Sequence, residues 1–175
     1  MRDLAPADLE SATLVGALER VAERTALASG DDLRVTVDVS GRPRPLPVPV
    51  ETALLRIAQS ALANVVQHAG ASRAAVTLSF LGDAVALDVV DDGRGFDPLA
   101  LPGPRPGADG GSAVGPEERG DGATGAATPP PRSGFGLTAM RSRVAELGGT
   151  FSLETEPGAG TALAVHLPLD PQETR

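Results

Sequence analysis

The sequence of 175 residues contains no cysteine, no tryptophan and no tyrosine, and only four phenylalanines. Without cysteine the chain has no disulfide, no thiol nucleophile and no zinc–thiolate site. Because aromatic side chains are so few, alanine, valine and leucine must fill the interior, and hydrophobic residues make up 41% of the chain. The length is that of one ordinary domain.

The chain also has little positive charge, since 15 Lys and Arg residues face 23 Asp and Glu residues. The net charge of -8 and the pI near 4.7 argue against a nucleic-acid-binding protein, which needs a basic face. An anionic ligand would therefore be held by local dipoles or a metal ion. No apolar run approaches membrane-span length and no signal peptide is visible. We expect a cytoplasmic chain without direct membrane contact, which could be the soluble part of a larger membrane protein.

The spacing of apolar residues predicts alternating helices and strands. Helices are expected at residues 11–29 with Ser11 as N-cap, at 50–69, and from Gly136 to the glycine pair 148–149. Alternating patterns predict strands at residues 33–40, 72–80, 84–91, 150–156 and 161–169. The Pro-rich residues 41–49 are expected to be neither helix nor central strand. Paired strands with short turns favour an α+β fold, with an antiparallel or mixed sheet and helices on one face.

A long segment at residues 97–133 is dominated by Gly, Pro, Ala and charged residues. It exceeds the length of an ordinary loop, and its composition predicts mobility. We therefore expect one domain over residues 11–170 that contains this insertion, with a linker at residues 1–10 and a tail at residues 171–175.

The stretch VALDVVDDGRGFDP places a carboxylate pair, Asp91 and Asp92, at the end of a predicted strand, followed by Gly93 and Gly95. A carboxylate at a strand end can accept a hydrogen bond from an exocyclic amine such as adenine N6. Neighbouring glycines let the backbone approach a flat ligand. The same residues are ordinary turn chemistry, and alone they favour a turn.

Polar residues also interrupt the second predicted helix. Ser60, Asn64 and His68 are four residues apart and share one face, with Gln67 beside it. This stripe could face solvent, or it could face a ligand cavity and place the Asn64 amide oxygen on Mg²⁺. Taken alone it favours the solvent-facing alternative, and spacing identifies no acid partner that would make His68 a general base.

The stretch SGFGLTAM places Gly134 and Gly136 before the last predicted helix. The unpaired N–H groups and the dipole of a helix start suit a phosphate group. A single G-x-G-L pattern remains a weak signal.

Together and in this order, the three motifs resemble the ATPase domains shared by sensor histidine kinases, gyrase, the Hsp90 chaperones and MutL. RIAQSALANVVQHAGA is similar to the N-box of that family, DDGRGFDP to its D-x-G-x-G adenine box, GFGL to its second glycine box, and PGAGTALAVHLPL to its closing G-x-G-T strand. The spelling GLTAMRSRVAELGGTFSLETEPGAGT is closest to the kinase branch that signals to NarL-type response regulators. The resemblance covers residues 11–169 and implies a Bergerat fold, a two-layer α/β sandwich with a mixed, mostly antiparallel sheet and a long ATP lid at residues 97–133.

The resemblance implies ATP and Mg²⁺ as cofactors. Asp91 would take the adenine amino group, supported by Thr161 through water, and Gly93 and Gly95 would shape the adenine wall. Asn64 would ligate the Mg²⁺ that bridges the phosphates. Further nucleotide-binding positions would be Gln67 and His68 in the N-box, Phe96 and Phe135 at the two ends of the lid, and Gly134, Gly136 and Leu137 at the phosphate end.

Two positions depart from the family pattern. Ser60 stands where the N-box usually has the Glu associated with orienting or activating the attacking group, which leaves a catalytic role for Ser60 open. Gln67 stands where the box often has Lys or Arg. Nucleotide binding could survive both changes, whereas phosphoryl transfer depends on positioning and charge stabilisation.

No phosphoacceptor helix, with His followed by Asp or Glu in an amphipathic run, is found in the sequence. The resemblance therefore implies the catalytic fragment of a longer two-component sensor histidine kinase. This fragment, expected to be monomeric, would transfer the γ-phosphoryl group of Mg-ATP to a His on a separate dimerisation domain, and through it to a NarL-type response regulator. The alternatives are a serine kinase of the anti-sigma type, which MRSRVAELGG and the long first helix disfavour, and a nucleotide-binding module without transfer activity, which Ser60 and Gln67 favour.

Overall fold

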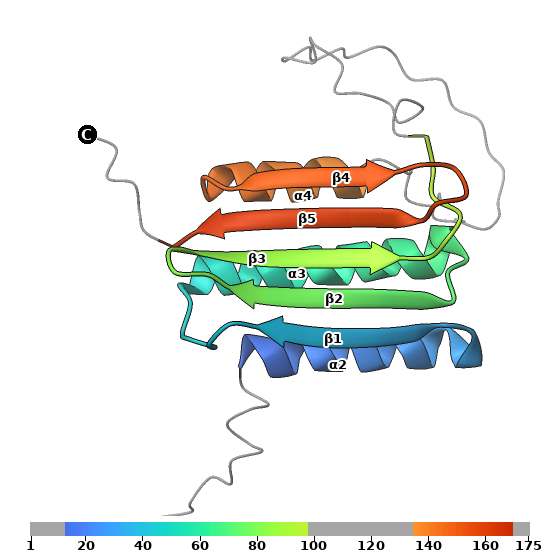
Figure 1. Ribbon diagram of the computed structural model, residues 1–175, viewed down its shortest axis with the longest axis horizontal. Helices are drawn as coiled ribbons and strands as arrows, with labels where there is room; N and C mark the ends of the chain where they lie inside the picture. Colours follow the sequence, from blue (N-terminus) through green and yellow to red (C-terminus); the bar gives the residue numbers. More distant parts are fainter. Residues whose placement is uncertain (1–12, 98–134, 170–175) are drawn as a thin grey trace, which may run out of the picture.

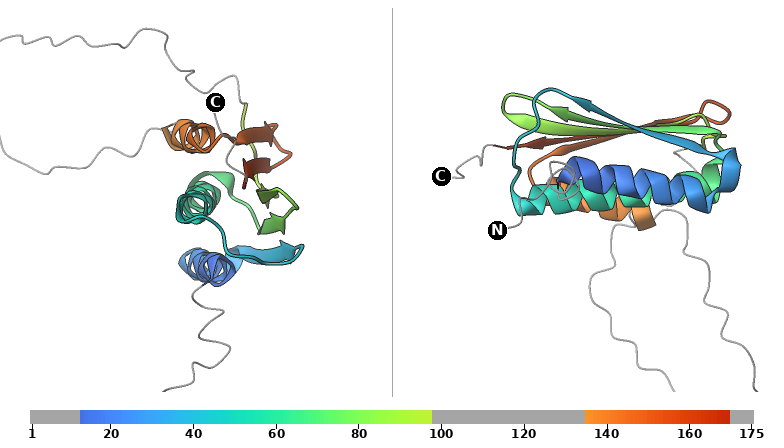
Figure 2. Two further views of the ribbon diagram at one scale, coloured as in Figure 1. Left: turned by 90° about the vertical axis from the view of Figure 1, so that its left-hand side faces the viewer. Right: turned by 90° about the horizontal axis from the view of Figure 1, so that it is seen from below.

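The structure, a computed structural model, describes residues 13–97 and 135–169 (Figure 1). Within these ranges the helices lie side by side in one layer and cover one face of a five-stranded sheet (Figure 2). The predicted α+β fold of two layers is confirmed. The predicted linker at residues 1–10, the predicted tail and the predicted lid from residue 98 onward lie outside the described residues.

The first helix, α2 (Leu14–Ala28), begins later than the sequence predicted. Its N-cap is Thr13, whose side-chain oxygen accepts a hydrogen bond from the Gly16 N–H at 3.3 Å. The prediction of Ser11 as the N-cap is therefore wrong, because Thr13 satisfies a free N–H of the first turn. The short 3-10 helix η1 (Gly30–Asp32) follows α2 and leads into the sheet.

The second helix, α3 (Val48–Asn64), begins earlier than predicted. Val48 and Pro49 are helical, so the prediction that residues 41–49 contain no helix is wrong for these two. Proline is tolerated there because the first turn of a helix has no intrahelical partners for its N–H groups. The carbonyl of Pro47 accepts from the Val50 N–H at 2.9 Å and starts the helix.

The last turn of this predicted helix is the π-helical segment η2 (Val65–Ala69). Gly70, with φ of +58°, ends η2 in the left-handed conformation that favours glycine. A π-helical turn is wider than an α-helical turn, and such turns are frequent at functional sites. The helix therefore widens between Asn64 and His68, which the sequence predicted to lie one regular α-helical turn apart.

Five strands form the sheet in the order β1-β2-β3-β5-β4. The β1–β2 pair is parallel and the other three pairs are antiparallel, so the predicted mixed, mostly antiparallel sheet is confirmed. The strands are β1 (Arg34–Ser40), β2 (Arg73–Phe80), β3 (Ala84–Asp91), β4 (Thr150–Thr155) and β5 (Thr161–Pro168). The predicted hairpin of β2 and β3 is present.

The third helix, α4 (Phe135–Glu146), packs beside α3 over β4 and β5 (Figures 1 and 2). The core lies between the helix layer and the sheet, and its largest fully buried side chains are Leu, Ile, Val and Met, including Leu54, Ile57 and Leu87. Aliphatic residues thus fill the interior, as the composition predicted. No helix within the two described ranges is both long and apolar enough to cross a membrane.

Candidate functional site

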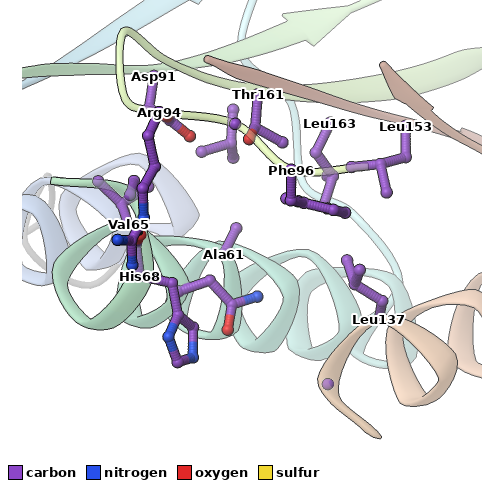
Figure 3. Close-up of a pocket in the computed structure, with 15 residues that line it drawn as sticks. Ala61, Val65, His68, Asp91, Arg94, Phe96, Leu137, Leu153, Thr161 and Leu163 are labelled. Carbon is purple, nitrogen blue, oxygen red and sulfur yellow. The ribbon is translucent and has the colours of Figure 1, made fainter. Parts of the chain in front are cut away.

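A pocket of about 300 Å³ opens between the helix layer and the end of β3 (Figure 3). Its walls come from α3 and η2, the loop after β3, the start of α4, and the strands β4 and β5. Eight residues that the sequence singled out meet in this pocket: Asn64, His68, Asp91, Gly95, Phe96, Gly136, Leu137 and Thr161. Segments far apart in the sequence therefore converge on one cavity, and apolar side chains such as Leu153 and Leu163 complete its lining.

Other predicted site residues do not line this pocket. Ser60 is half-buried on α3, Gln67 is exposed on η2, and Gly93 is buried behind the pocket wall. Gly134 lies outside the described residues. Phe135 is the first residue of α4, and the structure does not describe its side chain.

Asp91 lies at the end of β3 and is only 8% exposed. Its Oδ1 accepts a hydrogen bond from the Gly93 N–H at 2.9 Å. Burial raises the pKa of Asp91 above its ordinary value, and the charge of Asp92 adds to this, while the N–H groups of Gly93 and Thr161 oppose it. A partly desolvated carboxylate at a pocket end is a strong acceptor for a donor on a ligand.

Asp92 has a different environment although it is the next residue. Its carboxylate accepts from the Ser72 N–H, the Arg73 N–H and the Ser72 hydroxyl, each at 2.8 Å. The N–H of Arg73 and then the Ser72 hydroxyl are the main causes that lower the pKa of Asp92. Asp92 therefore ties the end of β3 to the start of β2, and Asp91 is the acid that faces the pocket.

The two glycines after the acid pair are required by contacts within the protein. A Cβ at Gly93 would lie 2.6 Å from the Cβ and from the carbonyl oxygen of Ala69 in η2. Gly95 has φ of +56°, and a Cβ there would clash with the carbonyl oxygen of Glu156. The space beside both positions is thus occupied by the protein's own chain, and of the two only Gly95 lines the pocket.

Asn64 faces the start of α4 at the other side of the pocket. A Cβ built on Gly136 would lie 4.0 Å from the Asn64 Nδ2. The amide of Asn64 and the first turn of α4, where N–H groups lack intrahelical partners, therefore border the same part of the cavity. The part of the chain that the structure describes contains no cluster of three or more His, Cys, Asp or Glu residues that could hold a metal ion. A metal here would rely on the Asn64 amide and on oxygens of the ligand.

Two residues with polar side chains that the sequence analysis missed contribute to the site. Arg94 lines the pocket, and its Nε donates to the carbonyl of His68 at the end of η2. Thr155, buried at the end of β4, lies behind Thr161 and contacts its hydroxyl. Arg94 could have been found in the sequence, because it is a cation between the two glycines of the DDGRGFDP motif. Thr155 gave no signal, because a Thr in a strand is unremarkable.

Comparison with known proteins identifies the family. Residues 50–171 match the family described as histidine kinase-, DNA gyrase B- and HSP90-like ATPases. The chain belongs to this family. The matched residues include every predicted binding residue, from Asn64 in α3 to Thr161 in β5.

Sensor histidine kinases are among its relatives. The chain is 32% identical over 166 residues, or 95% of its length, to the sensor histidine kinase MctS of Rhizobium johnstonii. It is 31% identical over 124 residues, or 71% of its length, to the sensor histidine kinase LiaS of Bacillus subtilis. The chain spans only 30% and 26% of the lengths of these two relatives.

Solved structures with the same fold are also histidine kinases. The histidine kinase domain of the Erythrobacter litoralis EL346 blue-light activated histidine kinase matches with a TM-score of 0.61 and 22% identity, over 92% of this chain and 63% of that one. Full-length ShkA in complex with AMPPNP matches with a TM-score of 0.60 and 24% identity, over 96% of this chain and 31% of that one. At these identities the likeness establishes the fold, which confirms the Bergerat-type arrangement implied by the sequence.

Proposed function

We propose that this chain binds Mg-ATP as the catalytic domain of a two-component sensor histidine kinase. It transfers the γ-phosphoryl group to a histidine on a separate dimerisation and phosphoacceptor domain. The observation that carries this proposal is the pocket itself, which has a buried carboxylate, Asp91, at one border and the Asn64 amide beside the start of α4 at another.

Adenine binds at the Asp91 border. The carboxylate accepts a hydrogen bond from the exocyclic amine, and Thr161, its partner in the register of β3 and β5, supports this contact. The apolar side chains of Phe96 and Leu153 offer surfaces for a flat ring. Apolar walls with a few placed polar groups are typical of small-molecule sites.

The phosphates bind at the border formed by Asn64 and α4. The Asn64 amide oxygen fits Mg²⁺, because this ion takes oxygen ligands, keeps several waters, and needs few protein groups. Bound Mg²⁺ would neutralise phosphate charge during transfer. The N–H groups at the start of α4, near Gly136, favour an anion through the helix dipole. His68, on the pocket lining, completes the rim.

A second candidate function, nucleotide binding without phosphoryl transfer, is favoured by one observation. Ser60, at the N-box position that usually carries Glu, does not line the pocket. Ser60 also lacks a charge with which to orient an attacking group. The chain would then hold nucleotide without positioning a nucleophile.

The partners follow from the names of the relatives, which are sensor histidine kinases. The chain acts in the cytoplasm as a monomeric domain beside its phosphoacceptor domain. Through that domain it serves a response regulator, which the motif spelling assigns to the NarL type.

Incubation with γ-labelled ATP and the phosphoacceptor domain of the parent kinase tests these functions. Acid-labile, alkali-stable label on the acceptor domain is expected for the kinase. Acid-stable label on serine would indicate the anti-sigma type of kinase instead. Nucleotide binding by calorimetry without any label would support the second candidate, and no binding of ATP would contradict both.

A further inference from the structure

Thr155 and Asp91 are the two polar side chains that are buried in the described part of the chain. The sheet register connects them, because Asp91 pairs with Thr161 across β3 and β5, and Thr161 pairs with Thr155 across β5 and β4. The three residues form a row at the strand ends that border the pocket. Thr161 and Asp91 line the pocket, and Thr155 lies behind them.

The hydroxyl of Thr155 has three neighbours. Its Oγ1 lies 3.0 Å from the carbonyl oxygen of Gly160, 3.1 Å from the N–H nitrogen of Phe96, and 3.3 Å from the Oγ1 of Thr161. A hydroxyl has one proton to donate and two lone pairs with which to accept. These three contacts therefore use the full hydrogen-bonding capacity of Thr155.

The chemistry of the neighbours fixes the direction of each bond. A carbonyl oxygen can only accept, so the Thr155 proton goes to Gly160, and the N–H of Phe96 can only donate. In the contact between the two hydroxyls, Thr155 has no proton left, so Thr161 must be the donor. The Thr161 proton is thus directed away from the pocket.

We propose that Thr155 is a positioning residue that makes the site specific for a purine with an amino group at C6. Because its own proton points to Thr155, Thr161 offers only lone pairs to the pocket, and the Asp91 carboxylate also offers only lone pairs. The border of the pocket formed by these two residues therefore accepts hydrogen bonds and cannot donate them. An exocyclic amine matches this border, whereas an oxo group at C6 meets only acceptors. A site built to bond one group rejects the analogue that leaves its polar atoms unpaired.

This inference rests on the proposed nucleotide binding. Three nucleoside diphosphates distinguish a failure of the inference from a failure of nucleotide binding itself. ADP has an amino group at C6, IDP has an oxo group, and purine riboside diphosphate has neither. The affinity for purine riboside diphosphate thus measures changes in the rest of the pocket. Such changes include any movement of Phe96 when its N–H no longer has the Thr155 hydroxyl as an acceptor. If the wild-type protein binds none of the three, the proposed function fails before the inference is tested.

The variant Thr155→Val keeps the shape of the side chain and removes its hydroxyl. Measured by calorimetry at pH 7.5, its affinity for ADP relative to purine riboside diphosphate is expected to fall, because the Thr161 hydroxyl is no longer held with its lone pairs toward the pocket. The fall should not exceed about three- to tenfold, the scale of one neutral hydrogen bond. Its relative affinity for IDP is expected to rise, because the Thr161 proton can now turn into the pocket. Thr155→Ser, which keeps the hydroxyl, is expected to restore the wild-type ratios. Equal changes for all three diphosphates would show a merely structural role and overturn the inference.

A second variant tests the same point without altering Thr155. Thr161→Val removes the acceptor itself, so the ADP preference over purine riboside diphosphate is expected to fall about three- to tenfold, at least as far as in Thr155→Val. The gain for IDP is not expected, because no hydroxyl proton remains to turn. An unchanged ADP preference in Thr161→Val would overturn the inference even if Thr155→Val did not fold.

Discussion

Asp91 and Asp92 are adjacent carboxylates whose pKa values shift in opposite directions. The ionised form of Asp91 is disfavoured by burial, whereas the ionised form of Asp92 is stabilised by donors from residues 72 and 73. A pKa that differs between the folded and unfolded states makes stability depend on pH. The folded protein therefore loses stability by keeping Asp91 charged and gains stability from Asp92.

Asp91→Asn is expected to separate binding from stability. The folded pKa of Asp91 is raised above the ordinary value of 3.8, so its contribution to stability falls as pH rises from 3.8 through the folded pKa. At pH 7.5 the variant should have a free energy of unfolding at least as high as that of the wild type, by urea denaturation. Its affinity for ADP should fall by about 1.5–3 kcal/mol, the scale for hydrogen bonds to a charged group. A less stable variant, or one with unchanged ADP affinity, would contradict this assignment.

Asp92→Asn is the matched control and should behave in the opposite way. The folded pKa of Asp92 is lowered below 3.8, so its stabilising contribution is present above 3.8 and is lost as pH falls through the folded pKa. The variant should be less stable than the wild type at pH 7.5, and the two should converge at strongly acidic pH. Urea denaturation across this range measures the difference, and a gap that does not depend on pH would show that the charge of Asp92 is irrelevant.

Asn64→Ala tests the proposed magnesium ligand. Because Mg²⁺ takes few protein ligands, removing one should reduce the gain in ADP affinity that magnesium provides, by about tenfold. Binding without metal should change less. Gln67→Ala is the control, since Gln67 is an exposed residue of η2 that does not line the pocket. Calorimetry with magnesium and with EDTA gives the four affinities, and an equal magnesium effect in the two variants would exclude Asn64 as the ligand.

At the scale of the element, periodicity predicted the three helices and five strands, because each buries one face against the same core. Boundaries were less predictable, since they depend on single contacts such as that of Thr13 with Gly16. The π-helical turn η2 could not be predicted, because Val65–Ala69 has the apolar spacing of an ordinary helix end.

The parallel pairing of β1 with β2 and the role of Thr155 depend on contacts between distant residues. Phe96 and Thr155, for example, are 59 positions apart and bond directly. A single sequence gives the alternation of each strand and the hairpin of β2 with β3, but not the pairing of strands that are far apart in the chain. The motifs predicted Asp91, Asn64 and Thr161, which meet in one pocket. Asp91 and Asn64 are polar residues in apolar elements, and Thr161 belongs to the G-x-G-T pattern. No motif or unusual residue type singles out Thr155 in the sequence.

The close approach of η2 to the end of β3 predicts the effect of Gly93→Ala. The added Cβ would lie 2.6 Å from Ala69 and 2.8 Å from the Asp91 Oδ1, so η2 must move away. Overpacking of this kind costs about 1–3 kcal/mol. Gly82→Ala is the control, because a Cβ there meets nothing within 4 Å. Urea denaturation should show a loss of stability for Gly93→Ala that clearly exceeds that of Gly82→Ala, and equal losses would mean that η2 adapts freely.

At the scale of the whole molecule, the pocket joins both layers, so a ligand bound there should stabilise the entire fold. At a free ADP concentration 100 times Kd, binding should add about 2.7 kcal/mol to the free energy of unfolding. Thermal unfolding with and without ADP and magnesium measures this as a rise in Tm. The rise should be much smaller for Asp91→Asn at the same ADP concentration. No rise in the wild type at that concentration would show that ADP does not bind the folded state preferentially.

The place of β5 in the sheet has a consequence for synthesis on the ribosome. β5 is the last strand in chain order that the structure describes, yet it lies between β3 and β4. Until residues 161–168 emerge, β3 has only β2 beside it, and its other edge is open to unwanted partners. Asp91 also lacks its β5 neighbour Thr161 until these residues have been synthesised. A nascent chain therefore has no complete nucleotide pocket, and ATP cannot guide its early folding. A bound nucleotide can therefore stabilise only a chain whose sheet is complete.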